Sequence, residues 1–333
     1  YTQSQADVLL AAKATNTAVA LKAPIASPSF TGSVGIGTAS PSRTLEVYSS
    51  QPAIKLNNGT NAFTIGTGAF VDGSNSLVFH DEGVGERMRI DSSGNVGIGV
   101  TPEAWHSNYT ALQVGGVGAI FGESLQGVGS ATRYGNNVYL NSGGSWAYQV
   151  TDEASMYRQQ DGTHEFYVAP SGSADAAINW TTAMIIDNAG IVRKTYQPAF
   201  SANAVDTSNV PINTFQTVNL TEIFDNNADF NPSTDAFTAP VGGKYQLNGS
   251  IRIDSLSHAS AYMYIRITTS NRGYYSIVSP PAFDSTPQYW GLTISHLADM
   301  DAGDTATLSF YIGGGTVGAD IHSESIFSGY LAC

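Results

Sequence analysis

The sequence VGIGT at residues 34–38 returns almost unchanged as VGIGV at residues 96–100. A proline and then a short apolar segment follow each copy, LEV at residues 45–47 and LQV at residues 112–114. The β-branched residues favour strands, and the alternating glycines allow another backbone to approach closely. A short strand of this kind cannot bury its own apolar side chains. The repeat therefore predicts an extended, modular β chain on which another segment or another chain packs.

The residues that lead into the second copy are themselves repeated, since IDSSG at residues 90–94 returns as IDNAG at residues 186–190. The pattern Asp-x-x-Gly forms turns in which glycine takes a positive φ. Together with the Asn-Gly and Asp-Gly pairs that recur between residues 30 and 197, it predicts short strands separated by hairpin turns. The glycine-dense stretch 115–129 is the expected irregular connector within this region.

One helix is predicted, over residues 4–22, where Ser4 to Asp7 fits a capping box and an alanine-rich sequence follows. Pro24 and Pro28 end it. A lone helix of this length with a weak apolar stripe is marginal in water. Two interpretations stay open, a frayed linker and a short helical bundle between identical chains.

The sequence pattern changes after residue 197, where the expected strands become longer and richer in β-branched and aromatic residues. About 136 residues of this kind fit one β-sandwich. We therefore expect four segments: a short helical connector at 1–24, a β-repeat shaft segment at 25–114, a second β-rich shaft segment at 115–197, and a sandwich head at 198–333.

The composition excludes several classes of function. The 333 residues carry 14 basic and 27 acidic side chains, a net charge of −13, which disfavours nucleic acid and anionic membranes as partners. Only 12% of the residues are charged, about half the usual share of roughly 25%, as in many extracellular structural proteins. Cys333 is the single cysteine, so no intrachain disulfide is expected, and no apolar run is long enough to predict membrane insertion. The chain starts at Tyr1 and not at methionine, and we expect it to be a fragment or a processed product.

Acidic residues that could support catalysis occur as neighbours in sequence, at Asp81-Glu82, at Asp152-Glu153 and at Asp299, Asp301 and Asp304. Glycoside hydrolysis requires two carboxylates that face each other across a sugar, and neighbours on one strand or turn do not provide that arrangement. We expect residues 299–304 to form a solvated turn before a strand at 305–312, and the protein not to be an enzyme.

No metal or cofactor site is predicted. The acidic run 225–229 lacks the glycine and the distal glutamate of a helix-loop-helix calcium site, so it is interpreted as a turn. The six histidines are scattered, with no pair at the spacing of metal ligands. Structural calcium between subunits or in the head loops stays an open alternative.

Residues 1–197 resemble the shaft of a bacteriophage tail fibre. The resemblance rests on the opening residues 1–14, on ASPSFTG at 26–32, on RIDSSGNVGIG at 89–99 and on GTHEFYVAPSG at 162–172. It implies a trimeric fibre on the virion, attached by its N-terminal end to other tail proteins, that recognises a glycan or protein on the host cell surface. Other trimeric adhesins use related turns, so a surface fibre that is not from a phage remains an alternative.

Residues 198–332 resemble the C1q-like head domain, a jelly roll of the complement and tumour-necrosis-factor type. The matching positions are Phe200, Asp225, Phe230, Phe237, Gly243, Tyr245, Phe327 and Gly329. Asn219 and Leu247 depart from the pattern by replacing two phenylalanines. The resemblance implies a tight homotrimer, in which three parallel chains would cover one another's apolar strand faces.

Four aromatic residues of the head are the predicted receptor contacts, namely Tyr274, Tyr275, Tyr289 and Trp290, which stand where loops are expected to enter strands. Such rings stack on sugars and keep a polar edge in water. The alternative is that they are buried contacts of the trimer.

The full prediction is an all-β, elongated homotrimeric fibre with a short N-terminal helix, a β-repeat shaft and a jelly-roll head that adsorbs to the host without chemistry. The alternatives are a fibre that degrades polysaccharide and a structural spacer.

Overall fold

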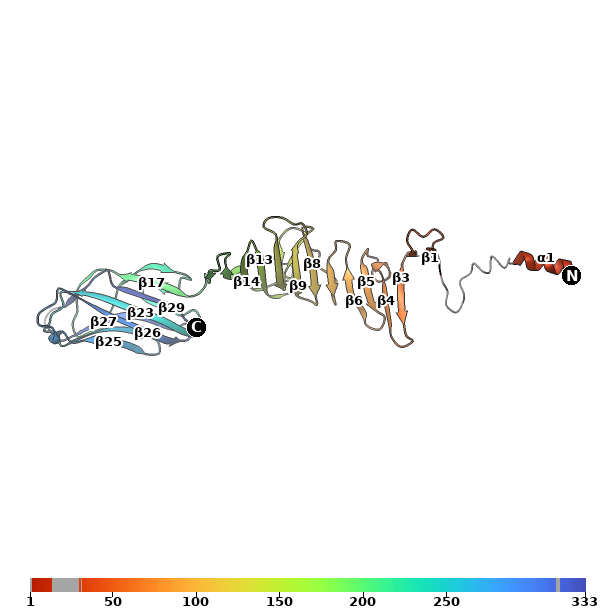
Figure 1. The fold of residues 1–333 in the computed structure, drawn as a ribbon. Coiled ribbons are helices and arrows are strands. Elements are labelled where there is room, and N and C mark those ends of the chain that lie inside the picture. The colour runs from red at the N-terminus through yellow and green to blue at the C-terminus, as the bar shows by residue number, and fades with distance from the viewer. Residues whose placement is uncertain (1, 14–29, 31, 316–317) are drawn as a thin grey trace. The chain divides into compact units, whose positions relative to one another are not determined.

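The computed structural model describes residues 2–13, 30, 32–315 and 318–333, which form one α-helix followed by strands and two short 3₁₀ turns (Figure 1). The expected all-β class is confirmed. The chain divides into two compact units, Tyr1–Ile191 and Val192–Cys333.

The helix α1 (Gln3–Lys13) begins earlier than predicted. Its capping box is formed by Thr2 and Gln5 and not by Ser4 and Asp7. The Thr2 amide donates to Gln5 Oε1 at 3.0 Å, and the Gln5 amide donates to Thr2 Oγ1 at 3.4 Å. Glutamine is one methylene longer than aspartate, and it is one of the two residues that the capping box requires at this position. The predicted continuation to residue 22, and the prolines at 24 and 28, lie outside the described residues.

The two copies of the repeat fold alike, as parallel strand pairs. Strand β1 (Val34–Ile36) pairs with β2 (Leu45–Val47), and β7 (Val96–Ile98) pairs with β8 (Tyr109–Val114). A Cβ on Gly35 would lie 2.3 Å from the Thr38 carbonyl oxygen, and one on Gly97 would lie 2.1 Å from that of Val100. The backbone that approaches these glycines is therefore the repeat's own turn.

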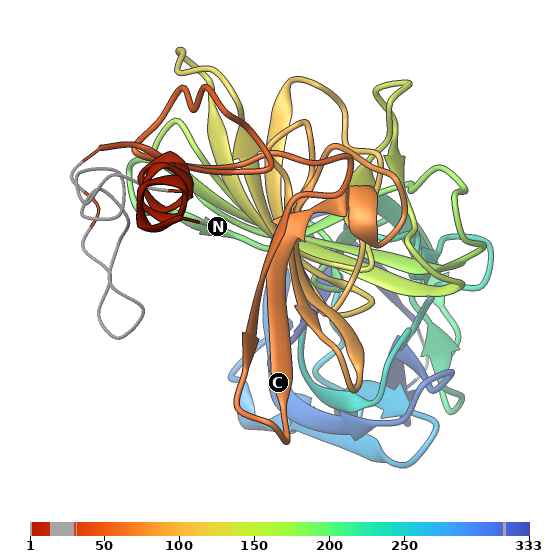
Figure 2. The same ribbon diagram turned by 90° about the vertical axis from the view of Figure 1, so that its right-hand side faces the viewer.

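Most strands of the first unit lie side by side in chain order in one sheet, and Figure 2 shows the strand direction turning along it. Its strands, besides β7 and β8, are β3 (Ala53–Asn57), β4 (Ala62–Thr67), β5 (Leu77–Asp81), β6 (Gly85–Ile90), β9 (Gly118–Glu123), β10 (Ala131–Asn136), β13 (Asp152–Gln160), β14 (Thr163–Gly172) and β15 (Thr181–Ile186). The 3₁₀ turn η1 (Gly68–Phe70) lies between β4 and β5, and β16 (Val192–Arg193) follows β15.

The stretch 115–129 forms the expected irregular connector only in its second part, since residues 124–129 lie outside strands. It contains strand β9 and the turn of the β8–β9 hairpin, where Gly115 has a φ of 62°. The glycines are compatible with strands here because β8 and β9 pair along their whole length and Ala119 and Phe121 between the glycines pack in the core. One sheet therefore continues across residues 114–115, the expected boundary between the two shaft segments.

One face of this sheet is covered by the unit's own loops and by the small hairpin of β11 (Tyr139–Leu140) and β12 (Trp146–Ala147). The core between them includes Trp105, Ala111, Phe121, Val138, Tyr148 and Met156. Gln113 is buried in this layer, where its Oε1 accepts hydrogen bonds from the Glu103 amide at 2.7 Å and from the Trp105 indole at 3.1 Å.

The second unit is a sandwich of two antiparallel sheets with jelly-roll connectivity. Its eight principal strands are β17 (Ala199–Ala204), β22 (Ala236–Thr238), β23 (Gly243–Asp254), β24 (Tyr262–Thr269), β25 (Gly273–Val278), β26 (Tyr289–Met300), β27 (Thr305–Gly313) and β29 (Ile326–Leu331). One sheet has the order β17-β29-β23-β26 and the other the order β22-β27-β24-β25. First and last strands are thus neighbours, as a jelly roll requires.

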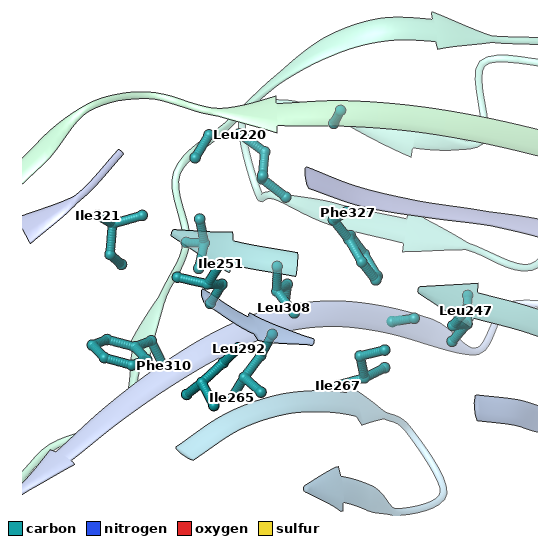
Figure 3. Packing of buried hydrophobic residues seen from close by; sticks show 14 of the residues in the cluster. Leu220, Leu247, Ile251, Ile265, Ile267, Leu292, Leu308, Phe310, Ile321 and Phe327 are labelled. Carbon is teal, nitrogen blue, oxygen red and sulfur yellow. The ribbon is translucent and has the colours of Figure 1, made fainter. Parts of the chain in front are cut away.

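Short strands extend both sheets of the head: β18 (Thr207–Val210), β19 (Gln216–Thr217), β20 (Leu220–Asp225), β21 (Phe230–Asn231) and β28 (Ala319–Ile321). The 3₁₀ turn η2 (Pro280–Ala282) precedes β26. Figure 3 shows side chains from both sheets, among them Leu247, Ile251 and Leu308, packed in one core.

The aromatic positions of the head signature meet in this core. The Phe200 ring lies 4.6 Å from that of Phe237, 5.3 Å from that of Phe230 and 5.1 Å from that of Phe327. Tyr245 is fully buried, and its hydroxyl donates to the Val241 carbonyl at 2.8 Å.

The remaining signature positions shape the backbone. Asp225 accepts hydrogen bonds from the amides of Asn227 at 3.2 Å and Phe230 at 2.6 Å, so it holds a turn. A Cβ on Gly243 would lie 2.6 Å from the Leu331 side chain, and one on Gly329 would lie 2.7 Å from that of Leu247.

The substitution Gly329→Ala is expected to lower the free energy of unfolding of the head by about 1–3 kcal/mol, because the new methyl group overpacks a core that is already filled. Gly291→Ala is the matched control, since no atom lies within 4 Å of a Cβ there. The urea midpoint of head peptides, measured by pulsed hydrogen exchange and mass spectrometry, checks this. Equal midpoints for the two variants would contradict it.

The substitution Gly97→Ala is expected to destabilise the β7–β8 pair by about 3 kcal/mol, because its Cβ meets a backbone oxygen that cannot turn aside. Gly116→Ala, where a Cβ meets nothing within 4 Å, should have no comparable effect. The measurement is hydrogen-exchange protection of peptides from β7 and β8. Unchanged protection in the Gly97 variant would show that the turn adapts.

Candidate binding surfaces

The four predicted receptor contacts lie on two edge strands and do not form one cluster. Tyr274 and Tyr275 are on β25, and Tyr289 and Trp290 are on β26, each at the edge of a different sheet. Successive strand residues point to opposite faces, so neither adjacent pair presents both rings to one ligand.

The side chains of the two pairs differ in exposure. Tyr274 packs partly buried against the core, with its ring centroid 3.9 Å from that of His296, while Tyr275 is 56% exposed. Tyr289 is 61% exposed, and Trp290 packs on Phe283 at 4.6 Å between ring centroids. Tyr275 and Tyr289 are thus the more accessible of the four.

Tyr275 belongs to a larger group of rings on the outward side of the β22-β27-β24-β25 sheet. We call this surface the outer aromatic face and define it by Phe215, Tyr262, Tyr264, Arg266, Tyr275 and Tyr311. The Tyr264 centroid lies 5.2 Å from that of Tyr262, 5.8 Å from that of Tyr275 and 5.9 Å from that of Tyr311. The rings therefore form one continuous aromatic surface.

Alternation along β24 places these side chains outward. Met263, Ile265 and Ile267 are fully buried in the core, so the residues between them face away from it. In the sheet register, Tyr264 stands between Tyr311 and Ile277. The sequence analysis used residues 262–268 only as a strand and missed this face. The sequence does contain a signal for it: aromatic residues stand at the alternate, outward positions of the strand, where polar residues are usual.

Arg266 is the only charged residue in β24, β25 and β27. Its guanidinium carbon lies 3.7 Å from the centroid of the Phe215 ring, and its Nε donates to Ser309 Oγ at 3.1 Å. Within the described ranges, no carboxylate lies at ion-pair distance from it. By contrast, Arg252 on the other sheet is paired with Asp254 at 2.9 Å and with Glu324 at 2.8 Å.

The hydroxyl of Tyr311 on this face is held in its protonated form. A hydrogen bond with the Tyr262 hydroxyl, with a further contribution from burial, raises the pKa of Tyr311 above its ordinary value. The face therefore presents neutral rings, hydroxyl groups and a single positive charge.

The first unit has a second unusual surface, on the face of its long sheet opposite to the loop-covered core. Apolar residues there stand next to one another across successive strands in two rows. We call them the apolar stripe: Ile65, Phe79, Met88, Ile98 and Val114, then Leu112, Ile120, Tyr134, Tyr157, Phe166 and Met184.

The apolar stripe is not covered by the described residues of the chain. Val114 is 50% exposed, Tyr134 is 47% exposed, and Ile98 and Ile120 are each 43% exposed. The aromatic part is ordered by stacking, with the Tyr157 ring 4.9 Å from that of Phe166. Contiguous apolar patches of this kind mark interaction surfaces, whereas single exposed apolar residues do not.

The acidic pairs are engaged in local contacts. Asp81 pairs with Arg87 at 3.2 Å, and its pKa is lowered chiefly by a hydrogen bond from the Gly83 amide. The Thr64 hydroxyl, which donates to Glu82, lowers the pKa of that carboxyl. A carboxylate with a lowered pKa is a poor general acid.

The other acidic groups form turns and ion pairs. Asp299 pairs with Lys244, and Asp304 accepts a hydrogen bond from the Asp301 amide at 2.9 Å. Among the described residues, no three His, Cys, Asp or Glu side chains are grouped so that they could hold a metal ion. Nor is any described helix long and apolar enough to cross a membrane.

No protein-family model and no curated protein matches this chain. Among solved structures, it is similar to the globular domain of zebrafish Complement 1qA protein, with 20% identity, a TM-score of 0.31, and coverage of 41% of this chain and 98% of that one. It is also similar to murine APRIL at pH 8.0, with 11% identity, a TM-score of 0.32, and coverage of 40% of this chain and 98% of that one.

Proposed function

We propose that this chain is a homotrimeric receptor-binding fibre of a tailed bacteriophage. Its head binds a glycan or protein on the host cell surface, and its N-terminal segment joins other tail proteins of the virion. The observation that carries the proposal is the apolar stripe, which runs across the first unit and which the described chain leaves in water. The tail-fibre phrases at 89–99 and 162–172 lie in this same sheet.

Identical chains are the partners that fit the apolar stripe best. A copy of this chain carries the same rows of apolar side chains at the same strand spacing, so the rows match along their whole length. Closed rotational symmetry then buries every stripe at once. Each fully buried aliphatic or aromatic side chain stabilises the assembly by roughly 1.5–3 kcal/mol, and the half-exposed residues of the stripe would gain part of that.

Binding without chemistry suits the carboxylates of this chain. Asp81, Glu82 and Asp299 are held in ion pairs with basic residues of neighbouring strands. Three heads on one fibre, and several fibres on one virion, give avidity, so each contact need not be strong.

The trimer predicts a solution mass of three 35.0 kDa chains, measured by light scattering after size exclusion. The double substitution Ile120→Lys and Phe166→Lys should reduce the trimer, because it places charges in the buried stripe. Val128→Lys is the matched control, because Val128 is fully exposed on a loop of the same unit. A wild-type protein that runs as a stable monomer would rule out the assembly.

The receptor-binding role predicts that purified trimer, added first, reduces phage adsorption to the host by at least tenfold at saturation. The measurement is the count of unadsorbed phage across a panel of candidate hosts, with polysaccharide digests assayed for new reducing ends in parallel. Sustained release of reducing ends would contradict binding without chemistry and favour a fibre that hydrolyses polysaccharide. Failure to protect any host that the phage infects would favour a spacer.

A further inference from the structure

We propose that the outer aromatic face of the head binds an acidic saccharide, with the sugar ring against Tyr262, Tyr264 and Tyr311 and the sugar carboxylate on Arg266. This inference rests on the proposed function, because it names the class of ligand and the place on the head that takes it.

The rings have the arrangement that a sugar needs. Tyr262 and Tyr311 stack at 5.9 Å with an angle of 12° between their planes, and Tyr264 adjoins both. Tyr262 is 36% exposed and Tyr275 is 56% exposed. Tyrosine rings pack on the C–H groups of a sugar, and their hydroxyls can bond to sugar hydroxyls. Packing of the fold does not require aromatic residues here, since Met263 and Ile265 on the same strand already fill the core.

The positive charge of Arg266 favours an acidic saccharide over a neutral one. Stacking on Phe215 and the hydrogen bond to Ser309 hold the guanidinium of Arg266 in one orientation, which leaves its two terminal nitrogens without a hydrogen-bond partner among the described residues. A guanidinium presented in this way matches a carboxylate through two parallel hydrogen bonds. Because Arg266 is the single charge on the outer aromatic face, we expect the bound sugar unit to carry one carboxylate.

A second copy of the same face is a poor occupant. Two such faces in contact would bring Arg266 against strands β24, β25 and β27, which contain no acidic residue. Burying an unpaired charge is costly, so this contact would be unfavourable. Arg252 has carboxylate partners within the chain. At Arg266 the carboxylate of the sugar would take that place.

The experiment uses the full-length trimer and two sets of oligosaccharides of matched length. Oligomers of galacturonic acid and of sialic acid are the acidic probes, and galactose oligomers are the neutral probe. Binding is measured by calorimetry at low and high salt. We expect the wild type to bind at least one acidic probe, more weakly at high salt, and at least tenfold more tightly than the neutral probe.

The variants test the residue. Arg266→Gln should weaken acidic binding at least tenfold and abolish its salt dependence, and Arg266→Lys should restore part of it. Arg252→Gln, which removes an arginine that is already paired, should bind as the wild type does. Each variant's mass and circular dichroism must match the wild type. Loss of the trimer in the Arg266 variants would overturn the inference, since the face would then be a subunit contact.

Two further outcomes would also overturn it: no binding of either acidic probe by a wild type that blocks adsorption, and unchanged adsorption blocking by Arg266→Gln. In both cases the receptor-binding function stands while the site or its ligand class fails. If the wild type blocks adsorption to no host that the phage infects, the proposed function fails in its own test, whatever the sugar data show.

Discussion

A single β-sheet has two faces, and the described residues of this chain cover only one face of the long sheet. Neighbouring residues show the consequence directly. Phe121 points into the core beside Trp105, whereas Ile120, one residue earlier, lies 43% exposed on the opposite face. Because the strand period is two, β8, β9, β13 and β14 of the long sheet supply both the core and the apolar stripe. The architecture of the first unit is thus complete only when something covers the second face.

The head solves the same problem within one chain. Its two sheets face each other, so the inward residues of β24 pack on the core residues of the opposite sheet. The residues between them point outward and are free of any role in the core. That freedom is what makes the outer aromatic face interpretable as a binding surface. Tyr264 and Arg266 are not needed to close the sandwich, and the side chains of both lie against the Phe215 ring.

Short sequence patterns predicted the structure correctly where steric limits of the nearby backbone dictate the residue type. The glycines of the repeat are needed because a Cβ would meet the Thr38 or Val100 carbonyl oxygen, and that constraint lies within a few residues. The aromatic spacing of the head likewise led to a jelly roll. Glycine density misled at residues 115–123, because glycine also occurs within paired strands, as at Gly118 and Gly122 of β9. The helix cap was misplaced by two residues because two overlapping segments offered a capping pattern.

The all-β class, the repetition of the β unit and the residues that share a strand face follow from the sequence, since these depend on φ preferences and on a period of two. The parallel pairing inside each unit appears only in the structure. Only the tertiary structure decided which strands become neighbours. Phe215, Tyr264, Tyr275 and Tyr311 come from four separate segments, and the jelly-roll register brings them onto one face. Strand order is set by burial of the whole core and not by any local segment, so neither the outer aromatic face nor the continuous apolar stripe could be predicted from spacing alone.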